Sequence, residues 1–170
     1  ALQNVVATTA SGAGHSGVYV TGVTAGVPVS ITDSRAEGVD QGIFFEAIDG
    51  SATVHNATAL SQDKHALLFD DFRAGSSVDL MNVEAASANS YGLRLLTHAG
   101  STIGVVGCRV EGADGLLASG LTAGVALNIA ASEIIGNTGG GAAVTLGDSA
   151  LAMANSVIRS LAGVGLTVDT

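Results

Sequence analysis

Apolar and polar residues alternate along this chain in short stretches that return about every 24 residues. The first such stretch of each repeat carries one apolar residue in a fixed place: Ile31, Val54, Leu80, Val105, Ile129 and Met153. Another apolar residue precedes each of these by two positions. Because side chains alternate between the two faces of a strand, both sets lie on one face. The pattern therefore predicts a short β-strand with an apolar inward face in every repeat.

Glycine turns mark the same period. Gly26, Gly50, Gly75, Gly100 and Gly124 are separated by 24, 25, 25 and 24 residues. A fixed period of roughly 20 to 50 residues is typical of a solenoid, a propeller or another repeat array. A propeller blade of ~40 residues does not fit this period, and the nonapeptides of a calcium-binding β-roll do not occur.

A corner is expected two residues after each inward apolar position. The residues there are Asp33, Asn56, Asn82, Gly107, Ala131 and Asn155. Asn, Asp and Gly adopt a left-handed backbone bend at low cost. A second alternating stretch follows this corner, with inward positions Ala36, Ala59, Ala85, Val110, Ile134 and Ile158.

A third alternating stretch completes the repeat. Its inward positions are Val18, Ile43, Leu67, Leu93, Leu116, Val144 and Leu166. Three strands per turn without a helical period predict an all-β fold, a right-handed, single-stranded parallel β-helix of about seven rungs with about 24–25 residues each. We expect residues 1–170 to form one such domain, as a segment of a longer β-helical chain, because no amphipathic cap is evident at either end rung.

Charge and composition limit the partners. The chain holds 15 Asp and Glu against 6 Lys and Arg, for a net charge of −9. Nucleic acids and anionic membrane surfaces attract clustered Lys and Arg, so neither is an expected partner. Insertion into a membrane is not expected either, because no apolar run approaches the ~20 residues that a spanning helix needs. The single cysteine, Cys108, is expected in the core.

The rung unit resembles that of a known family. The segments YGLRLLTHAGSTIGVVGCRVEG (91–112) and VTLGDSALAMANSVIRS (144–160) are similar to rungs of the pertactin-like passenger domains of Gram-negative autotransporters. The resemblance extends over nearly the whole chain and implies a secreted stalk, exported across the outer membrane to the cell surface. It implies a non-catalytic structural or adhesive role in virulence, with a host protein or a glycan as partner.

Outward positions of successive rungs become neighbours in a β-helix. In the third stretch this column is expected to contain Tyr19, Phe44, Leu68, Arg94, Leu117, Thr145 and Thr167. Tyr19, Phe44, Leu68 and Leu117 are large and apolar, and a continuous patch of this kind is typical of an interface. The patch predicts packing against another chain in a homo-oligomer or against a neighbouring part of a larger protein, or cover by a segment of the same chain. The unpaired strand edges of the end rungs separately predict end-to-end stacking of copies or cover by a longer chain.

A charged column is expected on the second stretch. It contains Arg35, Thr58, Glu84, Arg109, Glu133 and Val157. The alternating signs of Glu84, Arg109 and Glu133 predict a ladder of salt bridges on a solvated face, where each pair contributes only ~0–1 kcal/mol.

A second hypothesis is a carbohydrate-active β-helix, either a polysaccharide hydrolase, lyase or epimerase, or a glycan-binding protein similar to a phage tailspike. Glu46 and Asp70 follow equivalent phenylalanines, so we expect them on adjacent rungs ~5 Å apart. Paired carboxylates at ~5–10 Å can act as acid and base on a glycosidic bond, and Asp71 and His65 would complete the catalytic group. A calcium site at these carboxylates is a further alternative.

The non-catalytic hypothesis is favoured because the short, even repeats leave little chain to wall a groove. No cofactor is expected. No metal site is expected either, because the sequence lacks the HxxxH and CxxC pairs, and His15, His55, His65 and His98 fall in different columns.

Overall fold

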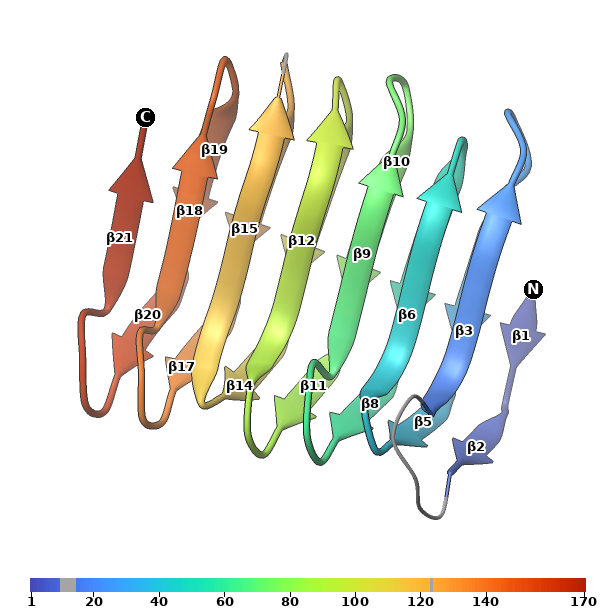
Figure 1. Ribbon diagram of the computed structural model, residues 1–170, viewed down its shortest axis with the longest axis horizontal. Helices are drawn as coiled ribbons and strands as arrows, with labels where there is room; N and C mark the ends of the chain where they lie inside the picture. The colour runs from blue at the N-terminus through green and yellow to red at the C-terminus, as the bar shows by residue number, and fades with distance from the viewer. Residues whose placement is uncertain (10–14, 123) are drawn as a thin grey trace.

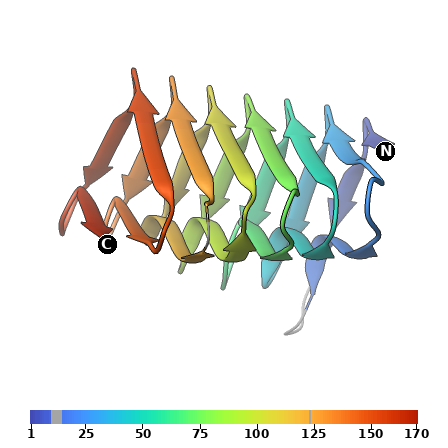
Figure 2. The ribbon, with the colours of Figure 1, turned by 90° about the horizontal axis from the view of Figure 1, so that it is seen from above.

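The computed structural model describes residues 1–9, 15–122 and 124–170 and shows a parallel β-solenoid (Figure 1). The described residues form strands and turns and contain no helix. There is accordingly no helical segment among them that could cross a membrane. Figure 2 shows the rungs following one another in sequence order along the long axis, with the chain ends at opposite ends of the rod. The predicted all-β solenoid is thus confirmed.

Each rung contributes one strand to each of three sheets of seven strands. The first sheet contains β1 (Leu2–Gln3), β4 (Val29–Thr32), β7 (Ser51–His55), β10 (Ser77–Met81), β13 (Thr102–Val106), β16 (Ala126–Ala130) and β19 (Ala150–Ala154). The second contains β2 (Val6–Thr8), β5 (Arg35–Gly38), β8 (Thr58–Ser61), β11 (Glu84–Ser87), β14 (Arg109–Gly112), β17 (Glu133–Gly136) and β20 (Val157–Ser160). The third contains β3 (Ser16–Val23), β6 (Gln41–Ile48), β9 (Leu67–Phe72), β12 (Tyr91–Ala99), β15 (Asp114–Thr122), β18 (Ala142–Leu146) and β21 (Leu166–Asp169).

The register follows the apolar alternation of the sequence. In the first sheet Leu80 pairs with Val54 on one side and Val105 on the other, and all three side chains are buried. One register prediction is wrong. Ala142, not Val144, is the partner of Leu116, because the glycine-rich connection at 137–141 ends two residues earlier than the spacing suggested. Ala143 therefore takes the outward place expected for Thr145.

The corner between the first and second sheets has the expected left-handed backbone. Asp33, Asn56 and Asn82 have φ values of 49°, 49° and 54°. Their side chains form a ladder, in which Asn56 Nδ2 donates to Asp33 Oδ1 at 3.2 Å and Asn82 Nδ2 donates to Asn56 Oδ1 at 3.3 Å. Ala131 occupies the same corner with φ 50°. The short polar side chains thus support one another from rung to rung.

At the corner between the second and third sheets, backbone segments of neighbouring rungs approach each other closely. At Gly42 an added Cβ would lie 2.7 Å from Leu60 N and 2.8 Å from Ala66 O. A side chain at this place would push the second sheet away from the third.

A second left-handed column bends the third sheet and is not anticipated by the sequence pattern. It comprises Gly22, Ala47, Asp71, Thr97 and Gly120. Because the left-handed residue interrupts the alternation, Phe45 and Ile48 both point into the core although they are three positions apart. The same bend turns His98 inward, in register with Phe72 and Leu121.

Candidate binding surface on the third sheet

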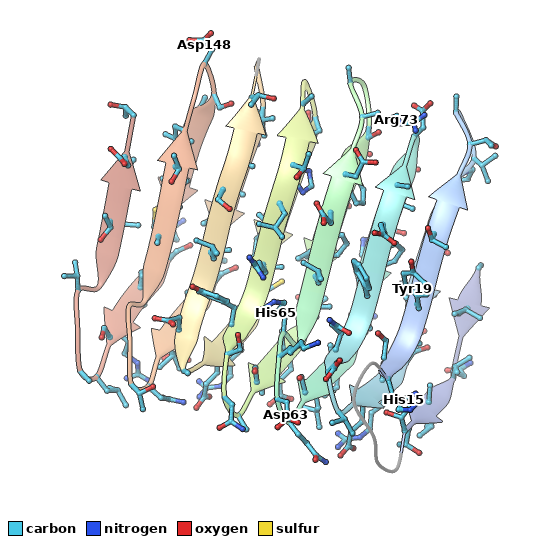
Figure 3. The ribbon with its side chains drawn as sticks, in the orientation of Figure 1. His15, Tyr19, Asp63, His65, Arg73 and Asp148 are labelled. Carbon is cyan, nitrogen blue, oxygen red and sulfur yellow. The ribbon has the colours of Figure 1, made fainter. Side chains whose placement is uncertain are left out.

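The expected apolar column is present on the outer face of the third sheet. Tyr19 is in register with Phe44, Phe44 with Leu68, Leu68 with Arg94, and Arg94 with Leu117. Tyr19 is 53% exposed, whereas Leu68 is only 6% exposed between its neighbours. Phe44 and Leu117 are partly exposed. Tyr19 and Phe44 thus supply the exposed apolar area, and Figure 3 shows Tyr19 on the face of β3 turned to the viewer.

The rings of Tyr19 and Phe44 stack along the axis of the solenoid. Their centroids are 4.9 Å apart and their planes differ by 26°. One face of each ring therefore lies against the other ring, and Phe44 is in register with Leu68 on the next strand. Aromatic side chains supply large apolar area, so this pair suits contact with apolar side chains of a partner.

Glu46 lies beside this aromatic pair. Its Oε2 accepts a hydrogen bond from the Tyr19 hydroxyl, and this bond raises the pKa of Tyr19 above its ordinary value. Asp70 is in register with Glu46 on the next strand, as the sequence predicts. Asp70 Oδ1 accepts the backbone N–H of Asp71 at 2.8 Å, and the Asp71 side chain is exposed. The carboxylates form a flat acidic border along the column.

His65 lies at the opposite end of β9 from these carboxylates, in the connection that precedes the strand (Figure 3). Asp70 is five positions further along the chain, which corresponds to roughly 16 Å along an extended strand. Of the four residues of the catalytic hypothesis, the structure brings Glu46, Asp70 and Asp71 together and leaves His65 apart.

His65 is instead a fixed, neutral partner of Arg94. Arg94 Nη1 donates to His65 Nε2 at 2.8 Å, and His65 Nδ1 lies 3.1 Å from Ser90 Oγ. Arginine has no acceptor atoms, so Nε2 must accept and the ring proton is assigned to Nδ1. Burial, followed by the charges of Arg94 and Lys64, lowers the pKa of His65 to about 4. This contact holds the guanidinium near the Tyr91 ring, 5.8 Å from its centroid.

The charged column of the second sheet forms a network that differs from the expected ladder. Arg109 pairs with Glu133, which also pairs with Arg159 at 2.9 Å. The other partner of Arg109 is Glu111, at 2.7 Å, in place of Glu84. Glu111 is two residues away on the same strand face, so the guanidinium reaches it without crossing to another rung.

A shallow hollow of about 380 Å³ lies over the second sheet and was missed by the sequence reasoning. Leu60 and Ala86 line it between the carboxylates of Glu37 and Glu111. Both carboxylates already pair with arginines on their own strands. The sequence pattern that could have indicated this hollow is the second outward column of the sheet. On successive rungs this column contains Glu37, Leu60, Ala86 and Glu111.

The other histidines lie at separate positions in the fold. His55 Nε2 lies 3.3 Å from Asp79 Oδ2 on the outer face of the first sheet. His98 is fully buried. Within residues 1–9, 15–122 and 124–170, no three His, Cys, Asp or Glu side chains are grouped so as to hold a metal ion.

Comparisons with protein-family models, with curated proteins and with solved structures find no match to this chain. The architecture of the chain is therefore known from its structure alone.

Proposed function

We propose that this protein is a non-catalytic β-helical module that presents the Tyr19–Phe44 face of its third sheet to a protein partner. The observation that carries the proposal is the stacked, outward-facing aromatic pair, of which Tyr19 is 53% exposed. An exposed aromatic pair bordered by polar groups is typical of an interface centre, because aromatic side chains contribute large contact area at low entropic cost.

The acidic border is consistent with binding in place of catalysis. Glu46 is held by the Tyr19 hydroxyl, and Asp70 by the Asp71 amide. Both carboxylates lie on the outer face of a sheet with short connections, and His65 is occupied by Arg94. A general acid and a base need instead to converge on a substrate held in a cleft.

We extend this proposal to the location of the protein, on the basis of the resemblance of its rungs to pertactin-like passenger domains. On that basis the module belongs to a secreted stalk exposed at the bacterial cell surface, where it acts as an adhesin. A single cysteine in the chain is consistent with export, because no disulfide has to form on the way.

The test measures binding to immobilised host-matrix proteins, with fibronectin, laminin and collagen as probes, and to a glycan array. Phe44→Ser removes the centre of the face, and Val106→Ser is the matched control, because Val106 is a 36% exposed apolar residue on the first sheet. We expect binding to a protein probe that Phe44→Ser weakens by at least about tenfold and Val106→Ser leaves unchanged. Absence of binding to every probe, or equal loss in both variants, contradicts the proposal.

One observation favours a second candidate, a carbohydrate-active β-helix. Glu46 and Asp70 are neighbours on adjacent strands, and the carboxylates of retaining glycosidases are ~5–5.5 Å apart. Release of reducing sugar from a polysaccharide panel, abolished by Glu46→Gln, is the result that this candidate requires. Glycan binding without release would point to a tailspike-like binder instead.

A further inference from the structure

Arg94 differs from the other Lys and Arg side chains in its partners. Each of the others pairs with a carboxylate: Arg35, Lys64, Arg73, Arg109 and Arg159. Among the residues that the structure describes, no Asp or Glu side chain lies within ion-pair distance of Arg94. Arg94 is nevertheless partly buried. Because an unpaired charge is costly to remove from water, a buried arginine ordinarily has an anion beside it.

Uncharged neighbours hold the guanidinium of Arg94 in place. Its Nη1 donates to Nε2 of the neutral His65 at 2.8 Å, and its Cζ lies 5.8 Å from the centroid of the Tyr91 ring. His65 is itself buried, and its Nδ1 lies 3.1 Å from Ser90 Oγ. These contacts fix the orientation of the guanidinium without neutralising its charge. An anion that binds here therefore meets a positioned donor, and little further side-chain entropy is lost.

The N–H groups of Arg94 that remain for a ligand are on its outer nitrogens. Nε is buried and has no acceptor. Nη1 keeps a second N–H besides the one donated to His65, and Nη2 has no acceptor in the described part of the chain. N–H groups of a planar guanidinium match the two oxygens of a carboxylate. A carboxylate also carries the single charge that one guanidinium balances, whereas a phosphate would bring additional negative charge close to Asp70 on the adjacent strand.

Apolar side chains flank Arg94 along the axis of the solenoid. Leu68 is in register with Arg94 on one side and Leu117 on the other, and Phe44 lies one rung beyond Leu68. Since neighbouring strands are ~4.8 Å apart, Phe44 lies ~10 Å from Arg94. The surroundings of the guanidinium therefore suit a ligand that has an apolar group next to its carboxylate.

We propose that Arg94 binds a carboxylate of the protein partner, while an adjacent apolar side chain of that partner packs over Leu68 and against Phe44. This inference rests on the proposed function, because it names the chemistry that the partner presents beside the Tyr19–Phe44 face. Glu46 and Asp70 border the same face on the other side, so they attract basic side chains of the partner and repel further acidic ones. The partner is thus selected by its charge pattern, with one acid placed at Arg94 and bases placed along the acidic border.

A titration with phenylacetate tests the carboxylate site without the partner. In this probe a ring stands about one rung away from a carboxylate, so the ring can lie over Leu68 when the carboxylate meets Arg94. NMR follows the backbone amide signals of Leu68 and Leu117 and the Nε–H signal of Arg94. We expect saturable shifts with phenylacetate and none of comparable size with phenylacetamide, which has the ring without the charge. Equal shifts with both probes, or no shift with either, would overturn the proposal.

Two arginine variants test which residue holds the carboxylate. Arg94→Gln removes the charge and keeps a polar side chain, and Arg73→Gln is the matched control, because Arg73 follows the third-sheet strand β9 and is 4.0 Å from Asp49. We expect Arg94→Gln to weaken the binding of phenylacetate by at least about tenfold, because a charge-assisted hydrogen bond is lost. Arg73→Gln should bind as the wild type does. Circular dichroism verifies that both variants keep their strands, and equal loss in both would contradict the assignment.

The same variants, applied to the matrix-protein probes, separate this inference from the proposed function. We expect a protein probe that Phe44→Ser weakens to be weakened by Arg94→Gln as well, and to be displaced by phenylacetate. If Phe44→Ser weakens the probe and Arg94→Gln does not, the proposed function stands and the carboxylate contact is overturned. If phenylacetate binds at Arg94 but no protein probe binds, the ligand is a free carboxylic acid, and the assignment to a protein partner is overturned together with the proposed function.

Discussion

The imidazole of His98 lies flat against the ring of Phe72 in the core of the solenoid, with 5.0 Å between centroids and 18° between planes. Its Nε2 lies 3.3 Å from Phe69 O, and its Nδ1 lies 3.5 Å from Ser101 Oγ. The residue extends an internal aromatic series in which Phe45 stacks on Phe69 at 5.1 Å. A titratable side chain thus takes a place that apolar residues occupy in the adjacent rungs.

The first prediction is a loss of stability in mild acid that depends on His98. Burial lowers the pKa of His98 to about 4, against 6.5 in the unfolded chain. Between these values the unfolded chain binds a proton that the folded chain does not, so the free energy of unfolding falls as the pH falls from 6.5 to 4. Since each pKa unit corresponds to ~1.4 kcal/mol, the total loss is on the order of 3 kcal/mol.

Chemical denaturation at several pH values between 4 and 6.5 measures this dependence. His98→Leu should fold, because Leu121 occupies the same column in the next rung, and should lose part of the slope. His15→Gln is the control, because His15 is exposed. Equal slopes for wild type and His98→Leu would contradict the prediction.

The inward turn of His98 also shows where sequence reasoning stops. The first corner could be predicted because Asn and Asp recur there and both residue types favour the left-handed bend. The bend in the third sheet is formed by Ala47 and Thr97 as well as glycines, and neither Ala nor Thr indicates such a backbone. The alternation of inward and outward residues after this bend therefore could not be predicted from the sequence. The inward position of His98 could not be predicted either.

The candidate site was predictable only in part, for a similar reason. Glu46 and Asp70 follow Phe45 and Phe69 by one residue, so their pairing follows from local spacing alone. The burial of Leu68 and the contact between Arg94 and His65 depend on long side chains that reach across rungs. No periodic pattern specifies where such side chains end.

The second prediction concerns the aromatic series in the core. Phe69 is fully buried between Phe45 and Phe72, so Phe69→Ala leaves a cavity and should lower the free energy of unfolding by ~3–5 kcal/mol. Phe44→Ala removes a ring of the same size from the outer face and should cost much less. Urea denaturation of both variants provides the comparison, and similar losses would contradict the assignment of inward and outward faces.

The third prediction tests the close approach of the second and third sheets. Gly42→Ala places a Cβ 2.7 Å from Leu60 N, a contact that only backbone movement can relieve. Gly104→Ala is the matched control, because its Cβ would lie 3.4 Å from Asp79 Oδ1 at the end of a partly exposed side chain. We expect Gly42→Ala to lose ~2 kcal/mol or more by thermal or urea denaturation, and Gly104→Ala to change little. Equal stability of the two variants would show that this corner tolerates a side chain.

The fourth prediction is a gain in stability at Ala131. This residue holds φ at 50° in a corner where most other rungs have Asn or Asp, and an alanine lacks a side-chain amide to offset the left-handed strain. Ala131→Asn should therefore raise the free energy of unfolding by ~0.5–1 kcal/mol, as urea denaturation can measure. Ala131→Gly should relieve the strain without extending the ladder, so comparison of its stability with those of the wild type and Ala131→Asn would separate the two contributions. Ala154→Asn, on the neighbouring strand β19, serves as the control, and an equal gain there would mean that the added amide acts without regard to the corner.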